Sequence, residues 1–187
     1  MVGAQEDAVV SIELVGPGAV RGLACPYCGR PMPLDEAGMI AAQAAWGWCG
    51  ALGIEDGRTV GLLLVSAATS GDPRVTVARI GAGWVRPGDV RQGTGRAMLH
   101  ALAGGLHRAR VGTLFASSDP HRGCAALPSG FLDGTGFIAM NPAHHWRLDL
   151  NGAVPVVKHS VLVRLGRLVR AVRPVAPPEP ARRTEIR

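Results

Sequence analysis

Two glycines with one residue between them stand where a helical pattern begins. Gly93 and Gly95 flank Thr94, and apolar residues of helical spacing follow at Ala97, Met98, Leu99, Leu102, Leu106 and Ala109. Glycine lets the backbone approach an anion closely, and the N–H groups of a first helical turn have no acceptor within the helix. The stretch therefore predicts a binding site for a phosphate or diphosphate.

The residues after these glycines show whether the stretch matches either of two common phosphate-binding motifs. A P-loop needs Lys-Ser or Lys-Thr after its last glycine, but Arg96 and Ala97 follow here. A dinucleotide-binding loop needs a third glycine at the position of Met98. Both motifs are therefore excluded. Two interpretations remain: another kind of anion-binding loop, or a glycine-rich helix start that binds no ligand.

The four cysteines could bind a metal. Cys25 and Cys28 are two residues apart and Gly29 follows, a spacing that places two thiolates on one edge of a tetrahedron. Cys49 and Cys124 complete a four-cysteine zinc site if their segments meet the first pair. Two alternatives stay open: buried thiols that act as small apolar side chains, and a redox-active pair at Cys25 and Cys28.

The elements that must position these residues form an α/β pattern. The run 61–65 is nearly all apolar, as in a strand buried on both faces. Asp35 is a helix N-cap, and Asp56-Gly57 is a tight hairpin turn. Expected strands cover 8–15, 50–54, 59–67, 74–85, 111–116, 137–140 and 145–150, and expected helices cover 36–46, 97–108 and, broken at Pro128, 124–135.

Composition places limits on the class of protein. The 187 residues suit one domain with a core, and 47% hydrophobic with 18% charged residues indicates a folded chain. No long apolar run or signal-peptide pattern is present, so we expect a cytoplasmic protein without a membrane span. The net charge of +6 comes from arginines and the single Lys158, but without an aromatic-basic face nucleic acid is not an expected partner.

The residues before and within the glycine stretch resemble the diphosphate-binding loop of the GNAT family N-acetyltransferases. The turn is Val85-Arg86-Pro87 and the loop is Val90-Arg91-Gln92-Gly93-Thr94-Gly95, with Val90 where the family has Gln or Arg. The resemblance covers residues 8–152 and implies a mixed, mostly antiparallel sheet flanked by helices. It also implies that the sheet splits near Val85 and Phe115 to admit acetyl-CoA or another acyl-CoA.

The resemblance also assigns residues to the cofactor. It places the thioester near Trp84, Val85 and Arg86, and the diphosphate around Val90, Arg91, Gln92, Gly93, Thr94, Gly95 and Arg96. The family's usual acid is a tyrosine at the position of Leu132, and the only tyrosine here is Tyr27. Catalytic residues are therefore unassigned, and the candidate bases are Glu55, Asp72, Asp119 and His121.

Three short segments narrow the resemblance to an actinobacterial branch of that family. They are 25–28, 46–50 and 124–132, and they contain all four cysteines. This resemblance favours the four-cysteine zinc site.

The ends of the chain are expected to lie outside this domain. Residues 153–173 predict a basic amphipathic helix, with Val157, Val161, Leu165, Leu168 and Val172 on one face. That helix docks on the domain or, alternatively, binds a membrane surface or polyanion. Residues 1–7 and the Pro/Arg-rich tail 174–187 are expected to be disordered.

Taken together, these features predict an acyl-CoA-dependent N-acyltransferase in which an amine attacks the acetyl thioester directly. The acceptor is a small-molecule or protein amine, and the chain could act as a homodimer. The alternative is a non-catalytic acyl-CoA-binding module, or a zinc-stabilised interaction or sensor module, on the same fold.

Overall fold

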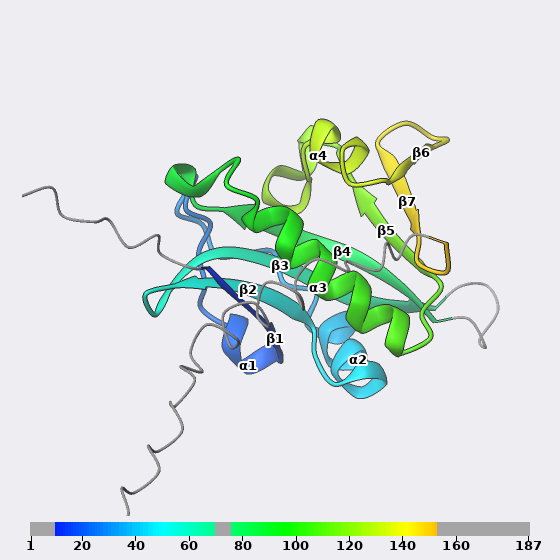
Figure 1. Ribbon diagram of the computed structural model, residues 1–187, viewed down its shortest axis with the longest axis horizontal. Coiled ribbons are helices and arrows are strands. Elements are labelled where there is room, and N and C mark those ends of the chain that lie inside the picture. The colour runs from blue at the N-terminus through cyan, green and yellow to red at the C-terminus, as the bar shows by residue number, and fades with distance from the viewer. Residues whose placement is uncertain (1–9, 70–75, 153–187) are drawn as a thin grey trace, which may run out of the picture. The chain divides into compact units, whose positions relative to one another are not determined.

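The computed structural model describes residues 10–69 and 76–152, which form a seven-stranded sheet (Figure 1). The strand order is β1-β2-β3-β4-β5-β7-β6, and every neighbouring pair is antiparallel except β4 and β5. The strands are β1 (Ser11–Val15), β2 (Gly50–Glu55), β3 (Arg58–Thr69), β4 (Thr76–Val85), β5 (Thr113–Ser117), β6 (Ile138–Met140) and β7 (His145–Asp149). The predicted mixed, mostly antiparallel sheet is confirmed.

Helices cover both faces of this sheet, and α3 crosses in front of the strands in Figure 1. The helices are α1 (Pro17–Val20), α2 (Glu36–Trp46), α3 (Thr94–Arg108) and α4 (Ser129–Asp133), with the 3₁₀ helices η1 (Pro87–Asp89) and η2 (Pro120–Ala125). Four of the six residues of the predicted apolar stripe are buried, since Met98, Leu99, Leu102 and Leu106 are at most 1% exposed. The other two, Ala97 and Ala109, are exposed, and Ala109 follows the last residue of α3.

β3 separates two hydrophobic clusters by alternation of its side chains. Leu63 and Val65 belong to the cluster under α3 and α4, whereas Leu62 and Leu64 belong to the cluster under α1 and α2. Burying each of these side chains contributes about 1.5–3 kcal/mol. The prediction that 61–65 is buried on both faces is therefore confirmed.

β4 carries one surplus residue and then leaves β5. Leu64 pairs with Ala82 but Val65 pairs with Ile80, so Gly81 is left without a partner on β3. Such a bulge bends the strand that carries it and increases its local twist. The parallel ladder between β4 and β5 is correspondingly short, with Ala78 opposite Leu114 and Arg79 opposite Phe115. The strands part beyond that point, as the resemblance implies.

Local signals set several boundaries where the sequence predicts them. The Asp35 side chain accepts a hydrogen bond from the N–H of Gly38 and caps α2, which ends at Gly47 in the left-handed region. Asp56 and Gly57 both have positive φ in the hairpin between β2 and β3.

Three helical segments differ from those expected. The four-residue α1 (Pro17–Val20) is not among the expected helices; Pro17 lies in its first turn, where the missing N–H costs nothing. α3 begins at Thr94 instead of Ala97. The single broken helix expected over 124–135 is two elements, η2 and α4, with Pro128 as the residue before α4.

Several expectations concern residues outside the described ranges. They are the disordered termini at 1–7 and 174–187, the basic helix at 153–173, the base candidate Asp72, and the start of the strand expected at 74–85. Among the described helices, none combines the length and apolar character needed to cross a bilayer.

Candidate functional site

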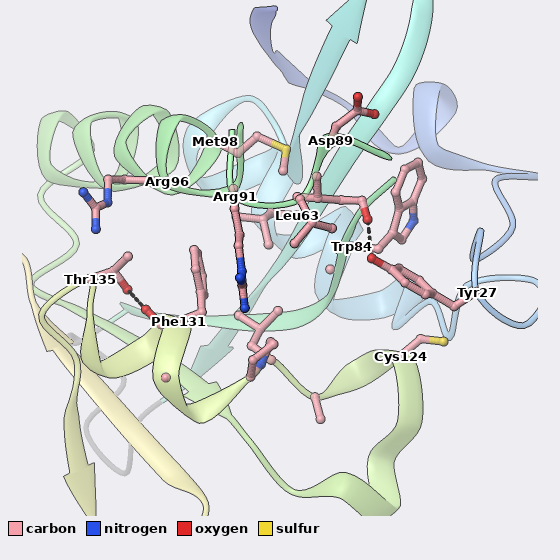
Figure 2. Close-up of a pocket in the computed structure, with 18 of the residues that line it drawn as sticks. Tyr27, Leu63, Trp84, Asp89, Arg91, Arg96, Met98, Cys124, Phe131 and Thr135 are labelled. Atoms are coloured by element: carbon pink, nitrogen blue, oxygen red, sulfur yellow. Dashed lines mark hydrogen bonds between the residues drawn. The ribbon is translucent and has the colours of Figure 1, made fainter. Parts of the chain in front are cut away.

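A cleft of about 990 Å³ lies where β4 and β5 part (Figure 2). Its walls come from the end of β4, the loop into α3, the segment containing η2, and α4. Most of the wall is apolar, and its apolar side chains include Leu63, Met98, Leu127, Pro128 and Phe131. This volume is at the upper end of the roughly 300–1,000 Å³ typical of small-molecule sites.

The end of β4 directs main-chain groups into the cleft. The N–H of Arg86 donates to the carbonyl of Val60 on β3, and successive residues of a strand direct their N–H and C=O groups to opposite sides. Gly83 and Val85 therefore direct theirs away from β3, and both residues line the cleft. An extended ligand can use these groups as a neighbouring strand would.

The loop into α3 presents further main-chain donors. Arg91 and Gly93 both adopt positive φ, +70° and +89°, and Gly93 is the N-cap of α3, so no capping side chain covers the helix start. The first helical bond runs from the N–H of Ala97 to the carbonyl of Gly93. The N–H groups of 94–96 therefore have no acceptor within the helix, and the helix dipole adds positive potential there.

Gly95 keeps the space at this helix start open. A Cβ at Gly95 would lie 3.3 Å from the ring of Phe131 and 3.5 Å from the side chain of Val85. Because Gly95 has no side chain, α3, α4 and the end of β4 can lie close together and still leave the main chain at the helix start accessible to a phosphate.

Two arginines add positive charge to this cradle. Arg91 extends into the cleft and Arg96 lines its far wall beside α4 (Figure 2). A guanidinium N–H of Arg96 donates to the carbonyl of Gly134 at 3.3 Å, while its other N–H groups can bind an anion. Backbone donors and guanidinium groups together suit a diphosphate.

Arg86, which the resemblance places near the thioester, makes ion pairs beside the cleft. Its guanidinium binds Asp89 through two nitrogens and Glu55 at 3.1 Å, and the hydrogen bond to Asp89 raises the pKa of Arg86. The arginine thus ties the loop before α3 to the hairpin between β2 and β3, and it is not among the residues that line the cleft.

Seven of the ten residues expected to bind the cofactor line the cleft: Trp84, Val85, Val90, Arg91, Gly93, Gly95 and Arg96. Besides Arg86, the exceptions are Gln92, whose amide donates to the carbonyl of Gly88, and Thr94. The Thr94 side chain is buried and its methyl group packs over Gly53 and Gly61. Thr94 can therefore offer the cleft only its main chain.

Three of the candidate bases, Glu55, Asp119 and His121, lie in the described ranges, and none of them lines the cleft. Glu55 is bound to Arg86, and the Asp119 carboxylate caps η2 by accepting from the N–H of His121. Leu132, at the usual place of the family's tyrosine, is fully buried. Within the described part of the chain, Asp89 is the one carboxylate in the cleft wall, and Arg86 already neutralises it.

Tyr27 is a cleft residue that the sequence analysis did not place. Its hydroxyl donates to the carbonyl of Val85 at 2.7 Å, and its ring lines the cleft (Figure 2). It lies on a short hairpin, the cysteine hairpin (24–31), which is closed by a bridge between Ala24 and Pro31. The signal in the sequence was its position between Cys25 and Cys28.

Three of the four cysteines meet at one end of the cleft. The sulfur atoms of Cys25, Cys28 and Cys124 all lie within 4.8 Å of one another. Cys49 is not in this group, is fully buried, and has its pKa raised by that burial. The structure thus assembles three of the four expected ligands and leaves Cys49 as a small core side chain.

The three thiols influence one another's ionisation. Burial opposes the ionisation of Cys25, but hydrogen bonds from Cys124 and from the backbone of Tyr27 and Cys28 outweigh it and lower the pKa of Cys25. The hydrogen bond to Cys25, together with burial, raises the pKa of Cys124 to about 12. Without a cation, one thiolate in this group therefore suppresses ionisation of its neighbour.

Comparison with known proteins rests on structure alone, because no family model matches the chain and no curated protein matches its sequence. Naa20 of Chaetomium thermophilum, solved with a bisubstrate analogue, matches 78% of this chain and 89% of its own, with a TM-score of 0.54 at 17% identity. Ard1 of Thermoplasma volcanium matches 74% of this chain and 94% of its own, with a TM-score of 0.50 at 15% identity.

A third similar structure is N-acetylglutamate synthase of Neisseria gonorrhoeae, solved with coenzyme A and N-acetylglutamate. It matches 78% of this chain and 36% of its own, with a TM-score of 0.52 at 14% identity. The three similar structures support the same fold as the strand order and the separation of β4 from β5. The described chain has the fold of the GNAT acetyltransferases.

Proposed function

We propose that this protein binds an acyl-coenzyme A, with acetyl-CoA as the first candidate, and transfers its acyl group to an amine. The observation that carries the proposal is the convergence of main-chain donors on an apolar cleft. Gly95 and Arg96, whose N–H groups lie in the first turn of α3, line the same cavity as Val85 and Arg91. A diphosphate joined to an extended, amide-containing arm matches that set of donors.

Charge and space support this assignment. The diphosphate would lie at the start of α3, where Gly95 leaves room and the two arginines supply positive charge. The arm would run beside the free edge of β4, which brings the acyl end toward Val85 and Tyr27. When bound, the cofactor supplies an activated acyl group as a thioester.

The main chain of β4 would then assist the transfer. The N–H of Val85 faces away from β3 and could donate to the thioester oxygen as negative charge develops on it, which lowers the barrier. The amine nitrogen forms the new bond to the acyl carbon, the carbon–sulfur bond breaks, and the amine proton passes to solvent. A thiolate is a sufficiently good leaving group that this route requires no strong acid from the chain.

The alternative is an acyl-CoA-binding module without turnover. Two observations favour this alternative. The one carboxylate in the described cleft wall, Asp89, is paired with Arg86 and so is a poor base. The position where the family has its acidic tyrosine is occupied by the buried Leu132. Both functions require cofactor binding, so only turnover distinguishes them.

Two measurements on the full-length protein test these functions. Calorimetry with acetyl-CoA is expected to give saturable binding, with free coenzyme A as the comparison ligand. Thiol release from acetyl-CoA is then followed with a panel of amines that includes small polyamines, amino acids and peptide N-termini. Binding with amine-dependent release supports transfer, binding without it supports the module, and no binding at all refutes both.

A further inference from the structure

The three-thiol group joins two segments from distant parts of the chain. Cys25 and Cys28 lie at the tip of the cysteine hairpin, whereas Cys124 lies in η2, after β5. The sulfur atoms of Cys28 and Cys124 are 3.5 Å apart. Thiolate sulfur is a soft ligand that suits zinc, so this contact joins the two segments through metal-binding groups.

The hairpin has the conformation that a pair of metal-binding thiolates needs. The N–H of Gly29 donates to the carbonyl of Cys25, and Gly29 has a φ of +68°, which favours glycine at this position. The N–H of Cys25 donates in turn to the carbonyl of Arg30 at 2.9 Å. The turn between the two cysteines is therefore fixed by the backbone, without help from a metal.

We propose that Cys25, Cys28 and Cys124 bind a zinc ion that fastens the cysteine hairpin to η2 at the edge of the cleft. Zinc–sulfur bonds of about 2.3 Å at tetrahedral angles place sulfur atoms about 3.8 Å apart, and the present separations are at most 4.8 Å. Only small side-chain adjustments are needed. Three thiolates select zinc over hard cations such as magnesium or calcium.

The fourth position of the tetrahedron is available to solvent. Cys25 is 3% exposed, but Cys28 is exposed and Cys124 is partly so, which gives the ion a route in and a side open to water. Cys49 is fully buried and outside the group, so it does not complete the site. The site is accordingly a three-cysteine centre, not the four-cysteine centre expected from the sequence.

The ion would also hold Tyr27 in the cleft wall. Tyr27 stands between two of the ligands, and its hydroxyl donates to Val85 of β4. Figure 2 places Tyr27 and Cys124 at the same end of the cleft. Zinc would therefore fix the wall on one side of the position proposed for the acyl group, but its binding does not depend on the proposed transfer.

The test measures metal in the full-length protein purified with a reductant and without chelators. We expect close to one zinc per chain by elemental analysis, and little in Cys28→Ser and Cys124→Ser. Cys49→Ala is the matched control and should retain the metal. Cys28 is exposed, so Cys28→Ser should keep the fold, which circular dichroism checks.

A second measurement uses cobalt(II) with metal-free protein. Thiolate-to-cobalt charge-transfer absorption should appear on titration, and Cys28→Ser should bind at least about 100-fold more weakly, a larger loss than removal of an outer-shell partner causes. Zinc well below one per chain without cobalt–thiolate absorption would overturn the proposal. So would equal zinc in Cys28→Ser and the unaltered protein, or a disulfide among these cysteines in the reduced preparation.

Discussion

The two ends of the cleft are built in different ways. The glycine end, comprising residues 86–96, is one continuous stretch whose functional groups are mostly main chain. The thiol end, comprising the cysteine hairpin and η2, brings together side chains 96 positions apart in the sequence. A continuous site is specified by local conformation, whereas an assembled site exists only once the whole sheet has formed.

This difference implies different responses to mutation. At the glycine end the identity of most side chains matters less than the absence of a Cβ at one or two positions. At the thiol end the side chains themselves form the site, so replacing one sulfur atom by oxygen, as in a Cys→Ser variant, removes a ligand. Replacing a thiol should therefore leave acetyl-CoA affinity intact, and variants at the glycine end should leave zinc binding intact.

The largest effect is expected for Gly95→Val. The new side chain would press on Phe131 and Val85 and close the anion cradle, removing about two charge-assisted hydrogen bonds worth roughly 1.5 kcal/mol each. Acetyl-CoA affinity by calorimetry should fall on the order of 100-fold. Gly104→Ala, farther along the same helix with only the flexible Arg108 nearby, is the control. An unchanged affinity in Gly95→Val would mean that this end is not the anion site.

Removal of zinc should have the next largest effect, on stability. At free zinc about 30-fold above its dissociation constant, bound metal adds about 2 kcal/mol, so a chelator should lower the melting temperature by about 4–8 °C. Cys28→Ser should not respond to the chelator. If both proteins shift equally, the chelator acts elsewhere and the thiol end is not the metal site.

Arg91→Asn should reduce acetyl-CoA affinity roughly tenfold, the loss of one charged contact of about 1.4 kcal/mol. Asparagine tolerates the positive φ of +70° at this position, so the change tests charge and not backbone strain. The loss should shrink as salt is added. Arg108→Ala, at the other end of α3 and exposed, controls for net charge and should bind normally.

The smallest effect is expected for Tyr27→Phe. It removes the hydrogen bond to the Val85 carbonyl and should change acetyl-CoA affinity less than about tenfold, the equivalent of 0.5–1.5 kcal/mol. Zinc content should stay the same, since both ligands beside it remain. A larger loss of affinity, at constant zinc, would mean that the two ends of the cleft are coupled through Tyr27 and Val85.

The sequence predicts the glycine end better than the thiol end for a physical reason. Strand, turn and helix start are contiguous from 84 to 96, so spacing alone places Gly93 and Gly95 at the helix start. Spacing alone does not reveal that Arg86 pairs with Glu55 or that the Thr94 side chain packs over Gly53 and Gly61, because these contacts depend on neighbouring strands. The spacing of apolar and polar residues along the sequence does not indicate such contacts.

At the thiol end the sequence supplies candidates but not the choice among them. The two-residue spacing and Gly29 identify the hairpin, but nothing local tells Cys49 from Cys124 as a partner. That choice depends on the segment after β5 folding back toward the hairpin, which the amide of Leu127 helps to fix by donating to the carbonyl of Ser117. Tyr27 lies in the cleft wall through a different long-range contact, its hydrogen bond to Val85 of β4.

The surplus residue at Gly81 means that the opening between β4 and β5 is produced by backbone geometry and not by particular side chains. Within the described residues, the strands are already separated without a ligand, so binding does not require the β4–β5 ladder to break. Side chains along the walls are correspondingly free to drift over evolutionary time. Such drift can retune which molecules the opening accepts while the opening itself persists.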